Sequence, residues 1–85
     1  MKKILFDSNK NIISKTLKLE RIKAGLTQSQ LAAKMQVLGV NIDQQMISKI
    51  ENNLRFVTDY ELACICKILN LSPKDMLSEF FKDNW

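Results

Sequence analysis

Apolar residues recur at helical spacing in several short stretches of this 85-residue chain. Leu31, Ala32 and Met35 share one face of a helix, and Ile47 and Ile50, three residues apart, share the inner face of another. No alternation of apolar and polar positions runs long enough to indicate a strand. The pattern therefore predicts an all-α domain.

Capping residues, glycines and one proline divide this pattern into five helices. Thr27 and Thr58 each precede a Gln or Glu by three residues, which is the signature of a capping box. Asp43 can cap the helix that follows it, and Ser72 can cap a helix that begins with a proline. We expect the five helices to begin near residues 13, 28, 44, 59 and 73.

The chain has the length of one domain, which we expect over residues 13–85 after an N-terminal arm over residues 1–12. The arm is either a short extended segment or a loose tail. No apolar run approaches the ~20 residues that span a membrane. Asp7 ends the basic and then apolar start of the chain too early for a signal peptide. We therefore expect a cytoplasmic protein.

Charge is distributed unevenly along the chain. The net charge is +4, but residues 1–57 carry a balance of +6 and residues 58–85 one of −2. A basic N-terminal part is typical of a surface that faces phosphates, although solvated lysines are common on any protein.

Histidine is absent and the two cysteines lie one residue apart. The spacing of Cys64 and Cys66 puts them on different faces of a helix, which disfavours a bridge between them. Without a histidine or a second cysteine pair, we expect no metal site and no cofactor. No nucleophile–base pair and no glycine-rich phosphate loop is visible, so we do not expect an enzyme.

Two runs carry a resemblance to a known family: LTQSQLA at residues 26–32 and MISKIEN at residues 46–52. They resemble the helix-turn-helix of the phage-repressor and Cro family of transcription regulators, and the similarity covers roughly residues 13–77. The resemblance implies a compact five-helix bundle, the lambda-repressor-like DNA-binding domain. It also implies that helix 44–52 enters the major groove of double-stranded DNA.

The chain departs from the family by an apparent insertion between the two helices of this unit. Either the first helix runs on to about Leu38 or the connector is a longer loop. We favour the longer helix, with Val37 and Leu38 continuing its apolar face and Gly39 ending it. Asn53 stands where the family usually has glycine, a mild change because Asn tolerates a left-handed turn.

Within the resemblance, four residues are expected to contact bases: Gln44, Gln45, Lys49 and Met46. Gln pairs bidentately with adenine, although Gln44 and Gln45 are also compatible with ordinary surface amides. Lys49 suits a guanine or a phosphate. Met46 suits a thymine methyl group or simple gap filling.

Four more residues are expected to contact phosphates: Gln28, Arg21, Asn52 and Arg55. Gln28 lies at a helix N-terminus, which favours anions. Arg21 and Glu51 match a pair that forms a salt bridge in the family, and Arg21 is expected to serve DNA as well. Arg55 is expected to be exposed.

Together these features predict a sequence-specific DNA-binding transcriptional regulator, a repressor, acting as a homodimer on a two-fold operator. Phe80, Phe81 and Trp85 are either the dimer contact or the end of the monomer core. No small-molecule ligand is evident. The alternative is a protein-interaction or antitoxin-like helical module built on the same fold.

Overall fold

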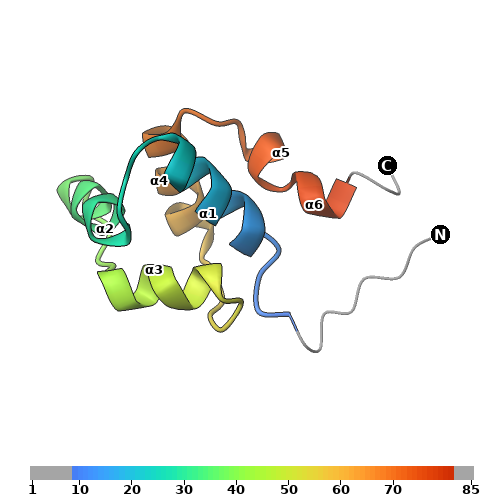
Figure 1. Ribbon diagram of the computed structural model, residues 1–85, viewed down its shortest axis with the longest axis horizontal. Coiled ribbons are helices and arrows are strands. Elements are labelled where there is room, and N and C mark those ends of the chain that lie inside the picture. The colour runs from blue at the N-terminus through green and yellow to red at the C-terminus, as the bar shows by residue number, and fades with distance from the viewer. Residues whose placement is uncertain (1–8, 82–85) are drawn as a thin grey trace.

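The computed structural model describes residues 9–81, which form six helices and no strand (Figure 1). The all-α prediction is confirmed for this part of the chain. The helices are α1 (Ser14–Lys23), α2 (Gln28–Val37), α3 (Gln44–Glu51), α4 (Asp59–Leu69), α5 (Pro73–Met76) and α6 (Ser78–Phe81). The predicted fifth helix is two short helices, because the backbone of Leu77 (φ −94°, ψ 11°) leaves helical geometry between them.

The predicted capping residues begin the helices. Thr27 Oγ1 accepts from the backbone N–H of Gln30 at 3.0 Å, and the Gln30 side chain accepts from the Thr27 N–H at 2.9 Å. Thr58 and Glu61 form the same reciprocal pair at the start of α4. The Asp43 carboxylate accepts from the N–H of Met46 at 2.8 Å and starts α3. Each bond satisfies a donor that the first turn of a helix leaves unpaired.

A single apolar core joins the first five helices. α3 packs against α1 and α2, α2 packs against α4, and α4 packs against α5. In Figure 1, α3 lies along the lower edge of the domain with α1 above it and α2 at one end. Every helix from α1 to α5 contributes at least one side chain with no measurable exposure: Leu17, Leu31, Met35, Ile47, Ile50, Ile65 and Met76.

The α2–α3 connector differs from the prediction in one respect. α2 does run on to Val37, and Gly39 (φ +87°) makes the left-handed turn after it. However, Val37 is 86% exposed and Leu38 is 46% exposed, so neither continues the apolar face. Val37 lies two residues after the buried Met35, which places it about 200° around the helix. Ile42, at 1% exposure, enters the core instead.

Hydrogen bonds close the connector at its base. The Val40 N–H donates to Met35 O at 3.0 Å, and the Gln36 side chain donates to Ile42 O at 2.7 Å. The connector between α2 and α3 therefore loops away from the core. The start of α3 is held by the buried Ile42 and by the two hydrogen bonds just described.

The cysteines of α4 are both buried and both free thiols. Burial raises the pKa of the Cys64 thiol and that of Cys66, so both stay protonated at neutral pH. Within residues 9–81 no cluster of His, Cys, Asp and Glu could hold a metal ion, and no helix there is long and apolar enough to cross a membrane. Most of the predicted arm, residues 1–8, lies outside the described residues, and so does Trp85.

Candidate nucleic-acid interface

Helix α3 divides cleanly into an inner and an outer side. Ile47 and Ile50 are fully buried, as predicted. Gln45, Lys49 and Asn52 are exposed and follow one another at spacings of four and three residues, so they form one line along the helix. We refer to these three residues as the outer line of α3. It is polar, carries one positive charge and has no helix packed over it within the described residues.

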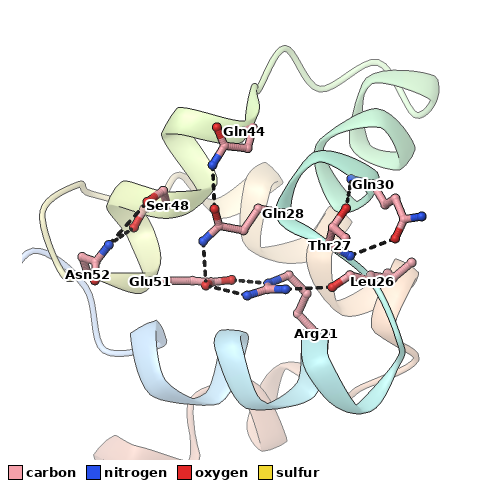
Figure 2. A network of polar contacts seen from close by, with 9 residues as sticks. All are labelled: Arg21, Leu26, Thr27, Gln28, Gln30, Gln44, Ser48, Glu51 and Asn52. Carbon is pink, nitrogen blue, oxygen red and sulfur yellow. Dashed lines mark hydrogen bonds and ion pairs between the residues drawn. The ribbon is translucent and has the colours of Figure 1, made fainter.

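Gln44 lies at the edge of this surface, turned towards α2. Its side-chain amide donates to Gln28 Oε1 at 2.7 Å, and Gln28 in turn donates to Glu51 Oε1 at 3.0 Å (Figure 2). The two amides therefore join the first turn of α2 to both ends of α3. This relay fixes the orientation of Gln44 and Gln28 before any ligand binds.

Beneath the relay, Arg21 and Glu51 form the predicted salt bridge. Arg21 Nε donates to Glu51 Oε2 at 2.6 Å and Nη2 donates to Oε1 at 3.0 Å, while Nη1 donates to Leu26 O at 2.7 Å (Figure 2). The two side chains are 10% and 2% exposed. The hydrogen bond to Glu51 outweighs desolvation and raises the pKa of Arg21, so the guanidinium stays charged.

A phosphate contact by Arg21, expected from the sequence, does not fit this burial. The residue lies under α3, on the inner side of α1, and its guanidinium is directed at Glu51 and at a backbone carbonyl. Its geometry assigns it to supporting Glu51, which would otherwise be a buried carboxylate without a counter-charge.

Arg55 also differs from the expectation of a freely exposed side chain. Nη1 and Nη2 donate to the two carboxylate oxygens of Glu61 at 2.9 and 3.0 Å, and Nη1 also donates to Phe56 O. The side chain is 24% exposed, and that of Glu61 is 4% exposed. These bonds use three of the five N–H donors of the guanidinium, so two donors remain for a phosphate.

Glu61 is the partner that the sequence did not single out. Its place in the capping box was a signal for a fixed carboxylate, but the path of the loop that brings Arg55 to it was not predictable. Burial alone would raise the pKa of Glu61. Hydrogen bonds from Arg55 and from the Thr58 backbone outweigh burial, and the pKa is lowered.

The remaining predicted site residues lie around α3. Met46 is partly buried and packs against the core, as the gap-filling alternative expects. The Asn52 side chain donates to Ser48 O at 2.9 Å at the C-terminal end of the helix (Figure 2). The structure thus brings Gln28, Gln44, Gln45, Lys49 and Asn52 to one side of the domain.

Comparison with known proteins agrees with this geometry. A family model described as Helix-turn-helix matches residues 17–76, a span that contains α2 to α5 and most of α1. The searches of curated proteins and of solved structures gave no match. Because the matched span covers most of the chain, the protein belongs to the helix-turn-helix family of phage-repressor and Cro type, a family of DNA-binding regulators.

Proposed function

We propose that this protein is a sequence-specific transcriptional regulator, a repressor, that places α3 in the major groove of an operator. The observation that carries the proposal is the outer line of α3, a polar face on a helix whose opposite face is fully buried. The major groove accommodates one α-helix and presents a distinct pattern of donors and acceptors for each base pair.

Gln45 and Lys49 are the proposed base-reading residues. A Gln amide matches the N6 and N7 edge of adenine, and a Lys ammonium matches the O6 and N7 edge of guanine. Both side chains are exposed and lie one turn apart. Gln44 reads a base with the atoms of its side-chain amide that are not bonded to Gln28.

Gln28, Asn52 and Arg55 are the proposed phosphate contacts. Gln28 begins α2, where backbone N–H groups and the helix dipole favour an anion. Asn52 and Arg55 follow the C-terminal end of α3, so the three residues flank the reading helix on both sides. Phosphate contacts of this kind set the register of a protein on DNA without reading the sequence.

We further propose that two copies bind a two-fold operator, with half-sites ~34 Å apart. One short helix reads too few base pairs for useful specificity. Phe80 and Phe81 on α6 offer apolar surface for the contact between copies, since Phe81 remains exposed. Analytical ultracentrifugation with and without operator tests this, and a one-to-one complex on a full site would contradict it.

Selection from a random pool of duplex DNA tests the proposed function directly. We expect enrichment of one motif with two-fold symmetry. The matched control is the double variant Gln45→Ala with Lys49→Ala, which keeps the buried face and should enrich nothing. A wild-type protein that enriches no sequence would overturn the proposal.

Salt dependence separates DNA binding from the alternative of a protein-interaction module. With ~6 phosphates neutralised by a dimer, the logarithm of affinity should fall against the logarithm of salt concentration with a slope near −5. A slope near zero would favour the protein-interaction module. The proposed role involves no catalysis and places the protein in the cytoplasm with the DNA that it regulates.

A further inference from the structure

The turn that follows α3 contains a residue in an unusual backbone conformation. Asn53 has φ +60°, in the left-handed region that few L residues adopt. Asn is among the residues that tolerate it, and Asn70 has nearly the same value (φ +56°) at the end of α4. The two positions share a backbone shape but differ in what their side chains do.

The Asn53 side chain reaches a segment more than forty residues earlier in the chain. Its Oδ1 accepts from the backbone N–H of Lys10 at 2.8 Å and from that of Asn11 at 3.0 Å. Its Nδ2 donates to the side chain of Asn9. The Lys10 ammonium also lies 5.1 Å from the centroid of the Phe56 ring. Figure 1 shows the segment before α1 running beside the loop after α3.

Asn11 completes the connection from the other side. Its Nδ2 donates to Ile50 O at 3.1 Å and to Arg55 O at 3.0 Å, while its Oδ1 accepts from the Ile13 N–H at 3.1 Å. Ile50 O also accepts from the backbone N–H of Asn53 at 3.1 Å, so Asn11 adds a second donor at the C-terminal end of α3. One side chain thus ties the start of α1, the end of α3 and the loop that carries Arg55.

We propose that Asn9, Asn11 and Asn53, here named the asparagine clasp, position the reading helix for DNA. α3 has only eight residues, so contacts at its two ends add to the buried Ile47 and Ile50 in fixing its tilt. Asp43 and the buried Ile42 hold the N-terminal end. The clasp holds the C-terminal end, and with it Asn52 and Arg55. This inference rests on the proposed function, because it concerns the same DNA-binding surface.

The substitution Asn53→Gly separates the effect of the clasp's hydrogen bonds from that of the left-handed backbone conformation. Glycine adopts φ +60° without strain, so the turn is retained while three hydrogen bonds are lost. We expect affinity for the selected operator to fall about fivefold to tenfold, as for the loss of a net hydrogen bond or two. Binding to random DNA should fall less, since there only the phosphate contacts of Asn52 and Arg55 are disturbed. The midpoint of thermal unfolding should fall modestly, because the lost bonds are intramolecular.

Asn70→Gly is the matched control, since it makes the same change at the same backbone shape, away from α3. It should alter neither operator affinity nor binding to random DNA. Asn11→Ala breaks the clasp from its other side and should reproduce the effect of Asn53→Gly. The double variant should lose little more than either single variant, because residues that act as one unit are not additive.

Hydrogen exchange gives a readout that needs no DNA. The N–H groups of Lys10 and Asn11 should be protected in the wild type and should exchange faster in Asn53→Gly, while the amides of α4 should not change. If the wild type binds a selected operator and Asn53→Gly binds it with equal affinity, the clasp proposal is wrong and the proposed function stands. Equal loss on operator and on random DNA would also overturn the clasp proposal. A wild type without sequence preference would overturn both the clasp and the proposed function.

Discussion

The two arginine–glutamate pairs of the domain have similar local geometry but different surroundings. Arg21 and Glu51 are 30 residues apart and join α1 to α3, with an arginine that is 10% exposed. Arg55 and Glu61 are six residues apart and join a loop to the helix that follows it, with an arginine that is 24% exposed. The inner pair connects distant elements, and the outer pair shapes one local turn.

This difference determines what each pair contributes. The inner pair lies directly beneath Gln28 and Gln44, so it connects the scaffold to the reading surface. The outer pair keeps Arg55 oriented at the edge of that surface. Two pairs of the same chemistry therefore have different roles. Arg21–Glu51 supports the fold, and Arg55–Glu61 orients a proposed phosphate contact.

The largest effect is expected for Arg21→Ala. Removing the arginine leaves Glu51 as a buried charge without a counter-ion, which costs about 3–5 kcal/mol in comparable pairs. Urea denaturation measures the free energy of unfolding. Lys23→Ala is the control, because Lys23 forms an exposed pair with Glu20 at 3.3 Å, and such pairs contribute about 0–1 kcal/mol. Equal losses in the two variants would contradict the structural role assigned to the buried Arg21–Glu51 pair.

Arg55→Ala should cost less, about 1–3 kcal/mol, because the buried Glu61 keeps its bond from the Thr58 backbone. Its effect on DNA should be uniform. We expect all sequences to bind more weakly and the salt slope to flatten by about one, as for the loss of a phosphate contact. Fluorescence anisotropy at several salt concentrations measures this. A change in base preference would mean that Arg55 reads sequence instead.

Lowering the pH should weaken the ion pair between Arg55 and Glu61. The pKa of Glu61 is lower in the folded protein than its ordinary value. Folded protein therefore binds this proton less readily than unfolded protein, and the stabilisation is complete only above the ordinary glutamate pKa of about 4.3. It should be lost as the pH falls below that value towards the folded pKa. The Glu61→Gln variant should be less stable than the wild type at neutral pH. Its free energy of unfolding should fall less on acidification than that of the wild type. A variant with the same acid profile as wild type would contradict the assignment.

The smallest effect on stability, within about 0.5 kcal/mol, is expected for Gln45→Ala, because the side chain is exposed. Its effect should be confined to recognition, at about 1–3 kcal/mol against the preferred base and almost nothing on random DNA. Lys49→Ala is the companion variant. If Gln45→Ala weakens operator and random DNA equally while Lys49→Ala relaxes base preference, the proposed register of α3 on DNA is wrong.

Features governed by neighbouring residues could be predicted from the sequence. Thr27 and Thr58 begin helices because a hydroxyl and a carboxylate or amide three residues later satisfy the same turn. Ile47 and Ile50 are buried because a three-residue spacing places both on one side of a helix. The salt bridge between Arg21 and Glu51 followed from the family resemblance, and the structure bears it out.

Features governed by the path of the chain could not be predicted. Val37 and Leu38 are apolar, but Val37 lies on the side of α2 that faces away from the core and Leu38 follows the end of the helix, so both are exposed. Arg55 is basic and follows the reading helix, yet the loop turns its guanidinium back to Glu61. The Asn11–Asn53 contact joins polar residues 42 apart, and such a contact leaves no periodic signal in the sequence.

The long sequence separation between the members of the clasp also affects when they can meet during synthesis. Asn11 and Lys10 leave the ribosome well before their partner Asn53, which follows Lys10 by 43 residues. At synthesis rates of about 5–20 residues per second, the interval is about 2–9 s. Glu51, the partner of Arg21, precedes Asn53 by only two residues, so both connections become possible at the same stage. The segment before α1 therefore remains without its partner throughout the synthesis of α1, α2 and α3.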